Sequence, residues 1–317
     1  AEGFVRQGTA WLAEGARPRQ GALAAEGGSA GVLDLRGAGP RAPRRYLPLY
    51  EAKMIHQFDH RWAGYAEDGE TTVDIPPARK RDPGFEPAPR YWVPAEEVEQ
   101  RLNAKGWSRG WLLGWRDIAR ATDERTVIAT VFPRVGVGNK IPLILSDQGP
   151  EFLAMLSGNL SSLVFDFASR QKIGGTTLNF FIVNQLPVLP PAFYTAPRLA
   201  FLLPRVLELT YTSHALAPFA RDLGHTGPPF AWDEDRRAQL RAELDAFYAR
   251  AYGLTRDELR YILDPAEVKG PGYPSETFRV LKEKEIRLYG DYRTARLTLA
   301  AWDRMEADGS FQAMDLP

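Results

Sequence analysis

Near its midpoint the chain reads Glu151-Phe-Leu-Ala-Met-Leu-Ser-Gly-Asn-Leu-Ser-Ser-Leu-Val-Phe-Asp-Phe167, and this stretch places apolar residues at helical spacing on one broad face. Three runs typical of strands precede it, because they are rich in β-branched, aromatic and other apolar residues. They are Trp111-Leu-Leu-Gly-Trp115, Thr126-Val-Ile-Ala-Thr-Val-Phe132 and Ile141-Pro-Leu-Ile-Leu145. Strands followed by a packing helix predict an α+β fold with a mixed, β-rich domain.

After Pro191 the sequence changes to helical periodicity. We expect helices over residues 192–223 and 233–252, and Gly253 is expected to end the second one. Thr255-Arg-Asp-Glu258 is a capping-box pattern that opens a further short helix, and two more are expected over residues 275–289 and 291–302. Residues 191–317 are therefore predicted to be a helical C-terminal extension.

Two segments before the strands are irregular in composition. Residues 1–45 are rich in Gly, Ala and Arg and predict a connector, with one strand at Gly31-Val-Leu-Asp-Leu-Arg36. Residues 66–95 contain six prolines around Arg79-Lys80-Arg81, which excludes a helix and predicts an extended loop. This basic loop is either a probe of a DNA groove or a solvated excursion. A short helix is expected over residues 94–102. Residues 46–190, which contain this helix and the predicted strands, are the predicted β-rich domain.

Composition limits the class of protein. With 317 residues, of which 44% are hydrophobic and 25% charged, the chain has ordinary globular usage and is long enough for two cores. The absence of cysteine excludes a disulfide framework, a thiolate zinc site and a cysteine nucleophile. No run approaches the roughly 18 apolar residues that span a bilayer, so we expect a cytoplasmic protein with no membrane partner.

Positive charge is concentrated in one part of the chain. Residues 101–140 carry eight basic side chains against three acidic ones, whereas residues 221–317 carry fifteen basic and eighteen acidic side chains. A surface that faces phosphate is therefore expected in the first of these parts. A GC-rich genome, which favours arginine codons, is the alternative explanation for the same arginines.

Two blocks frame the predicted β-rich domain. The first is Leu47-Pro-Leu-Tyr-Glu-Ala-Lys-Met-Ile-His-Gln-Phe-Asp-His-Arg-Trp-Ala-Gly-Tyr65, and the second is Leu178-Asn-Phe-Phe-Ile-Val-Asn-Gln-Leu-Pro-Val-Leu-Pro190. Together with residues 115–130, residues 156–163 and parts of residues 261–294, they resemble in order the target-recognition region of Eco57I-like and TaqI-like adenine-N6 DNA methyltransferases. This family includes type IIG restriction enzymes and phage-defence methylases, and the resemblance covers about residues 45–303.

The resemblance implies a DNA-specificity module that grips duplex DNA, reads base edges and holds the target adenine toward a methyltransferase domain. That domain and its cofactor, S-adenosylmethionine, are expected upstream in a larger polypeptide, while this part is expected to hold no cofactor, no metal and no catalytic residue. A restriction or translocase subunit is a candidate further partner.

Resemblance and charge together predict which side chains contact DNA. Arginine bidentate to guanine is the commonest base contact, so the arginines at 116, 120 and 125 are the candidate base readers, and the other members are expected to touch phosphate. The expected contact set is Lys53, His56, His60, Arg61, Arg116, Arg120, Arg125 and Lys140.

The motifs that would carry methylation are missing. Val135-Gly-Val-Gly-Asn139 is the candidate glycine loop for a cofactor, but with two glycines it is interpreted as a turn. Gly227-Pro-Pro-Phe230 imitates the catalytic tetrapeptide of adenine methyltransferases, yet Gly cannot supply the polar side chain that holds the adenine amino group. We therefore interpret it as a loop.

Other chemistries remain open. Asp34, Glu51 and Lys53 fit the loose spacing of a magnesium-dependent nuclease, in which two carboxylates hold the cation and lysine polarises the phosphate. Lys53, His56, Asp59 and His60 suggest a metal site if they share a helix face, although we interpret them as polar residues that orient a loop or touch phosphate. A pure protein-interaction module of a DNA-defence complex, docking through its C-terminal helices, is the remaining alternative.

Overall fold

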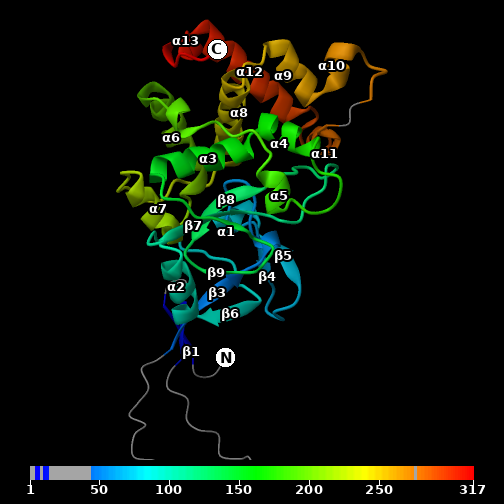
Figure 1. The fold of residues 1–317 in the computed structure, drawn as a ribbon. Helices are drawn as coiled ribbons and strands as arrows, with labels where there is room; N and C mark the ends of the chain where they lie inside the picture. Colours follow the sequence, from blue (N-terminus) through cyan, green and yellow to red (C-terminus); the bar gives the residue numbers. More distant parts are fainter. Residues whose placement is uncertain (1–3, 8–9, 14–43, 275–276) are drawn as a thin grey trace, which may run out of the picture.

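The computed structural model describes residues 4–7, 10–13, 44–274 and 277–317, and it confirms the α+β fold (Figure 1). The sheets lie toward the N-terminal end of the molecule and most helices toward the C-terminal end. The strands are β1 (Phe4–Gln7), β2 (Ala10–Ala13), β3 (Arg45–Tyr50), β4 (Ala63–Tyr65), β5 (Thr72–Asp74), β6 (Tyr91–Pro94), β7 (Trp111–Trp115), β8 (Ala129–Pro133), β9 (Gly136–Val137) and β10 (Leu143–Ile144).

The helices differ widely in length, from single turns to the eighteen residues of α8. They are α1 (Pro77–Lys80), α2 (Ala95–Ala104), α3 (Pro150–Ser161), α4 (Leu163–Arg170), α5 (Phe180–Val183), α6 (Ala196–Thr210), α7 (Ala217–Asp222), α8 (Glu234–Ala251), α9 (Arg256–Leu263), α10 (Pro265–Lys269), α11 (Arg279–Tyr289), α12 (Arg293–Ala307) and α13 (Ser310–Ala313). Three short 3-10 helices are η1 (Ala52–Met54), η2 (Pro191–Phe193) and η3 (His214–Leu216).

The strands of the described chain form three small sheets. The largest has the order β1-β2-β3-β6 in antiparallel pairs, and β9 joins β3 in parallel. β7 lies between β8 and β10 in a second antiparallel sheet, and β4 and β5 form a two-stranded ribbon. Every residue of β7 and β8 is buried, which explains why their sequences are apolar without alternation.

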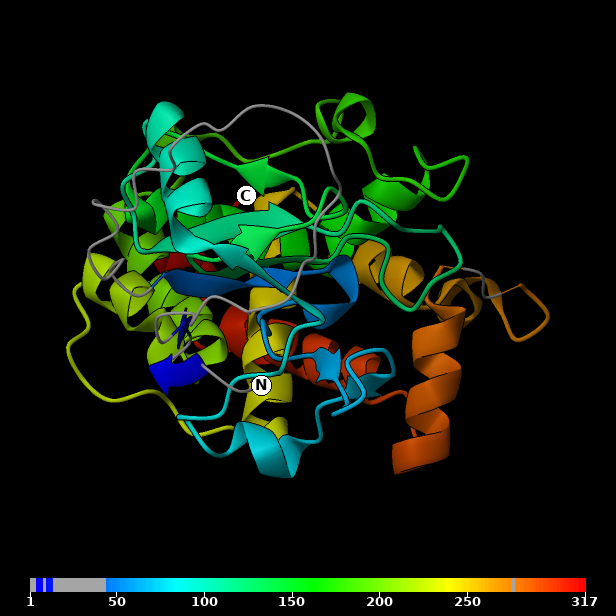
Figure 2. The same ribbon diagram turned by 90° about the horizontal axis from the view of Figure 1, so that it is seen from below.

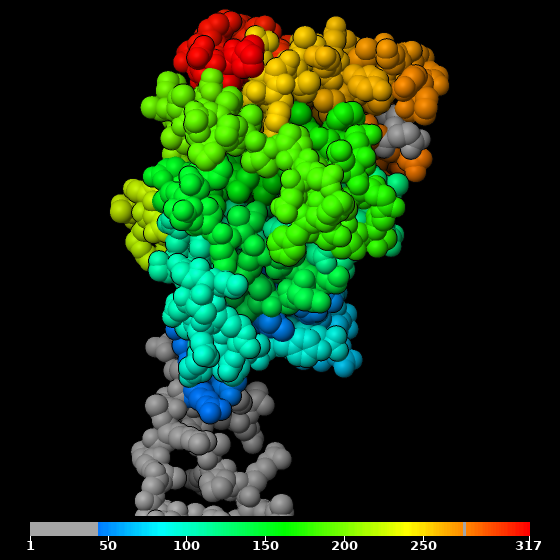
Figure 3. All heavy atoms as spheres, in the orientation of Figure 1, coloured from blue at the N-terminus to red at the C-terminus, as the bar shows by residue number. Residues whose placement is uncertain are grey.

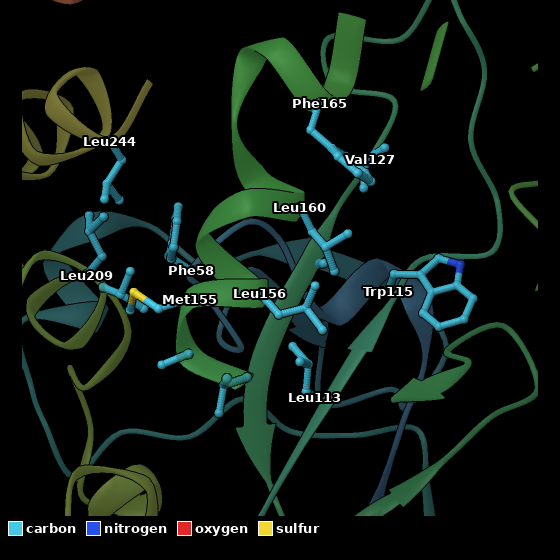
Figure 4. Packing of buried hydrophobic residues seen from close by; sticks show 14 of the residues in the cluster. Phe58, Leu113, Trp115, Val127, Met155, Leu156, Leu160, Phe165, Leu209 and Leu244 are labelled. Carbon is cyan, nitrogen blue, oxygen red and sulfur yellow. The ribbon is translucent and has the colours of Figure 1, made fainter. Parts of the chain in front are cut away.

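One hydrophobic core joins the sheets to the helices. α3 packs against both β8 and α6, and α8 contacts α4, α6 and α12. In Figure 4, Leu156 and Leu160 of α3 approach Leu113 of β7, while Met155 on the same helix lies near Leu209 of α6. The buried side chains form a single cluster from Leu47 to Leu316. The helices after residue 191 therefore share the core of the preceding domain, and Figure 3 shows them closely packed over one end of the molecule.

Elements set by local signals occur where the sequence predicts them. Three helices begin within two residues of the predicted start: α2, α9 and α12. The helix α11 begins later than predicted but covers most of the range 275–289. Thr255 and Glu258 form the predicted capping box of α9, and Gly253 has φ +76° at the end of α8. The segment that contains Gly227 is a loop, also as predicted.

Four predictions of local structure are wrong. The apolar stretch at 151–167 forms two helices bent by 60°, because Ser162 caps α4 and the Leu163 N–H donates to Asp245 instead of continuing α3. Residues 211–216 interrupt the helix expected over residues 192–223. The proline-rich loop contains the one-turn helix α1. β1 and β2 add strands to the expected connector, and the strand expected at 31–36 lies outside the described residues.

None of the described helices is individually long and apolar enough to cross a membrane. α3 and α4 reach that length and composition only when they are taken together across their bend, and most of their residues are buried inside the protein.

Candidate functional site

The blocks that resemble the methyltransferase family lie side by side in the fold. The indole Nε1 of Trp115 donates to the Leu178 carbonyl at 2.8 Å, and the Leu178 N–H donates to the Asp117 carbonyl at 2.6 Å. Gln57 Nε2 donates to the Val127 carbonyl at 2.7 Å, which joins the first block to residues 115–130. Segments far apart in sequence therefore form one continuous region.

Arg116 links two of these blocks at the surface. Its Nε donates to the carbonyl of Ile55 at 2.8 Å, and a terminal nitrogen lies 3.4 Å from the carbonyl of Lys53. Burial lowers the pKa of Arg116 to about 10, so the guanidinium is still charged at neutral pH. The half-buried Arg116 is thus a fixed positive charge beside Lys53.

Three further members of the predicted contact set are exposed. The Lys53 ammonium lies 4.5 Å from the centroid of the Tyr65 ring. The Arg120 guanidinium makes no hydrogen bond or ion pair within the described part of the chain. Its backbone is engaged: the N–H donates to Asp123, and the carbonyl accepts from the Thr126 hydroxyl. Lys140 Nζ lies 2.8 Å from Asp117 Oδ2, yet the lysine side chain is 45% exposed. With Arg116, these side chains can reach a ligand on the protein surface.

Arg61 is a structural residue, which corrects its prediction as a DNA contact. The side chain is completely buried, and its terminal nitrogens donate to the carbonyls of Lys80, Asp82, Phe85 and Thr212 and to the Thr212 hydroxyl at 2.9 to 3.1 Å. Arg61 therefore fastens the proline-rich loop to the stretch before η3. A guanidinium with all these bonds inside the protein cannot also reach a phosphate or base.

His60 and Arg125 are corrected for the same reason. His60 is buried, with Nε2 3.2 Å from both Glu86 Oε2 and Ser213 Oγ. Arg125 is 9% exposed, and its Nε lies 3.0 Å from the fully buried Asp166 Oδ2. That carboxylate also binds the Arg170 Nε at 2.7 Å. Arg125 therefore belongs to a buried ion-pair network that holds α4 against the start of β8.

The His56 side chain lines a cavity of about 560 Å³ and does not lie on the surface of a helix. Its imidazole stacks on Trp62 with ring centroids 4.2 Å apart and an interplanar angle of 28°. Desolvation and then the cations Arg116, Arg241 and Arg125 keep the His56 pKa well below its ordinary value, so the ring is neutral at pH 7. His56 is therefore expected to act through hydrogen bonds and stacking, and not through charge.

The structure does not assemble the metal tetrad. His56 and His60 point to different partners, and Asp59 is paired with Lys80 at 2.6 Å. Among the described residues, no group of three or more His, Asp or Glu side chains is arranged to hold a metal. Of the nuclease candidates, Asp34 lies outside the described residues, and Glu51 accepts a hydrogen bond from the Tyr65 hydroxyl.

The candidate glycine loop does not fit a nucleotide cofactor. Gly136 and Val137 form β9, and a Cβ built on Gly136 would lie 2.6 Å from the Val93 side chain. This close packing inside the sheet explains the glycine without a ligand. The described residues around it therefore offer no cradle for S-adenosylmethionine.

Sequence reasoning missed the residues on the far wall of the cavity. Trp232, Arg237 and Arg241 come from α8 and the turn before it, about 180 residues after His56. In the sequence, the Arg236-Arg237 pair and Arg241 stand among acids and resemble a solvated helix face. No local signal distinguishes the arginines that face the cavity, because the fold alone brings α8 against the segment after η1.

Comparisons with known proteins return no similar protein. No family model matches the chain, and neither a curated protein nor a solved structure does.

Proposed function

We propose that this chain is the DNA-specificity module of an adenine-N6 DNA methyltransferase or a related restriction-modification enzyme. In this proposal, an upstream domain of the same polypeptide binds S-adenosylmethionine and transfers the methyl group, while this module holds duplex DNA. The observation that carries the proposal is the contact of Arg116 with the carbonyls of Ile55 and Lys53. Because the Arg116 guanidinium lies against the backbone of Lys53, this contact supports a shared cationic surface.

Lys53, Arg116, Arg120 and Lys140 form the proposed contact surface, which we call the cationic rim. Lysine and arginine that neutralise phosphates release counterions, so duplex affinity must fall with salt. Arg120 is the candidate base reader, because its guanidinium is exposed and has no partner within the described part of the chain. Lys53 and Lys140 are candidate phosphate contacts.

Fluorescence anisotropy with a labelled random-sequence duplex tests the cationic rim. A Lys53→Ala/Lys140→Ala variant should bind more weakly, and the slope of log affinity against log salt should become shallower by about 2, since each lost phosphate contact removes about 0.9. The matched control is Lys269→Ala/Arg279→Ala, which removes two exposed cations from the helical part. Equal slopes for both double variants, or no duplex binding by the unaltered chain, would refute the proposal.

A further inference from the structure

The cavity beside His56 is lined by parts of the chain that are distant in sequence. The segment after η1 supplies one wall, the stretch from β5 to α1 a second, α8 a third and α11 with α12 a fourth, and Glu124 and Arg125 complete the lining. Figure 2 shows α11 standing apart at one side of the molecule, with the β4–β5 ribbon between it and the sheets. The volume of about 560 Å³ lies within the range of small-molecule sites.

Most charges around the cavity are already neutralised by a partner. Lys284 Nζ lies 2.7 Å from Glu124 Oε2, and Lys80 is paired with Asp59. Arg293 lies 2.8 Å from Asp235, and the wall residue Glu234 is 3.4 Å from Arg81. These pairs shape the walls, but they leave little charge for a ligand.

Arg241 is different, because its guanidinium has no hydrogen bond or ion pair within the described residues. It lines the cavity from α8, and its side chain is open to the cavity while protein surrounds it, which lowers its pKa by desolvation. The wall carboxylates of Asp245 and Glu285 act on its charge without a direct bond and are hydrogen-bonded elsewhere: Asp245 Oδ1 accepts the Leu163 N–H at 2.7 Å, and Glu285 accepts the Thr294 N–H at 2.7 Å. An unpaired guanidinium in a partly desolvated cavity is a strong anion site.

The cavity also has an aromatic wall. Trp62 carries the stacked His56 ring, whose nitrogens have no hydrogen-bond partner in the described part of the chain. Across from it, Trp232 lies 3.8 Å from the Arg237 guanidinium carbon. Lys80 Nζ lies 5.0 Å from the centroid of Trp62 and 4.6 Å from that of Trp232, so the face left for another flat ring is that of His56. A neutral imidazole can also hydrogen-bond to the edge of such a ring.

We infer that this cavity binds a nucleoside phosphate, with Arg241 on the phosphate and the His56–Trp62 wall beside the base. The anion accounts for the unpaired guanidinium, and the base accounts for the aromatic wall. Asp245 Oδ2, which accepts no hydrogen bond within the described residues, is available to accept one from a sugar hydroxyl or an exocyclic amino group. This site goes beyond duplex binding by the cationic rim and does not depend on it.

Isothermal titration calorimetry with adenosine 5′-monophosphate tests the site. The unaltered chain should bind the nucleotide, and Arg241→Gln should weaken it by about tenfold to a hundredfold, as expected for a lost charge-assisted hydrogen bond. Adenosine, which lacks the phosphate, should bind both proteins equally. The control is Arg236→Gln, on the same helix but paired with Glu208 outside the cavity. It should leave the affinity unchanged.

His56→Leu provides a second, independent variant, which should weaken adenosine and the nucleotide alike. Thermal melts establish that each variant is folded, and Arg241→Gln should melt with the unaltered chain because no internal bond is lost. Absence of nucleotide binding by the unaltered chain overturns the inference, and so does equal binding by the folded Arg241→Gln variant. Nucleotide binding without any duplex binding would keep this inference and refute only the proposed function.

Competition binding with DNA distinguishes two sources of the nucleotide: one extruded from duplex DNA and one free in solution. If the ligand is a nucleotide swung out of DNA, a duplex with one unpaired adenosine should displace the bound nucleotide, and a fully paired duplex should not. If neither duplex displaces it, a free nucleotide is the ligand. Displacement by the fully paired duplex in equal measure would contradict a nucleotide-specific cavity, because such a duplex presents no extruded base.

Discussion

Arg61 and Arg241 show two opposite uses of the same side chain. Arg61 is fully buried, and its terminal nitrogens donate hydrogen bonds to four carbonyls and a hydroxyl. Arg241 faces a cavity, and its guanidinium makes no hydrogen bond among the described residues. In one region the charge organises a loop, and in the other it is left for a ligand. Whether backbone carbonyls surround an arginine therefore decides its role more than its place in a motif does.

The strongest test of this comparison is the removal of Arg61. Arg61→Met should lower the free energy of unfolding by about 3 to 5 kcal/mol, because several buried acceptors lose their donors. Arg241→Met should change it by about 0.5 kcal/mol or less, since it breaks no bond. Urea unfolding monitored by tryptophan fluorescence measures both. Equal losses would show that the two arginines do not differ in role.

The next test concerns the carboxylate that Arg125 and Arg170 share. Asp166→Asn should lower the free energy of unfolding by about 3 kcal/mol, because it leaves two largely buried guanidinium groups without their counter-charge. Asp303→Asn breaks an exposed pair with Arg256 and should cost about 0.5 kcal/mol or less. A small loss from Asp166→Asn would mean that Arg125 is not held by this network and is free to read DNA.

Asp245 provides a pH test inside the cavity wall. Desolvation raises its pKa from 3.8 to about 6, so the folded state holds the proton more tightly than the unfolded state does. The resulting stabilisation is present below pH 4 and is lost as the pH rises through 6, a change of about 3 kcal/mol. Asp245→Asn should remove this dependence in urea titrations between pH 4 and 7. An unchanged slope would assign the dependence to another group.

The smallest expected effect on stability belongs to Arg120. Arg120→Ala should change the free energy of unfolding by less than about 0.5 kcal/mol, because its guanidinium is exposed and unbonded within the described chain. On a cognate duplex it should relax discrimination at one base pair by about 1 to 3 kcal/mol. Competition binding with single-base variants of the duplex measures this. Equal losses on cognate and random duplex would make Arg120 a phosphate contact.

Predictions from the sequence succeeded where a few neighbouring residues set the outcome. The capping box at Thr255 and the positive φ of Gly253 depend only on residues within one helical turn. The break at Ser162 could not be predicted in the same way, because it involves Asp245, more than eighty residues away. β7 and β8 were predictable as strands, and a helix packed against them was expected at α3, but the burial of every residue of the two strands depends on elements far away in sequence.

The sequence by itself therefore determined the α+β class and the ends of α8 and α9. Only the tertiary structure decided which cations are available, since Arg61 depends on Lys80 and Thr212, and Arg125 depends on Asp166. It also decided that α8 and the segment after η1 line one cavity. The physical reason is that helix periodicity and capping are local, whereas the desolvation and pairing of a charge depend on residues that only the fold brings together.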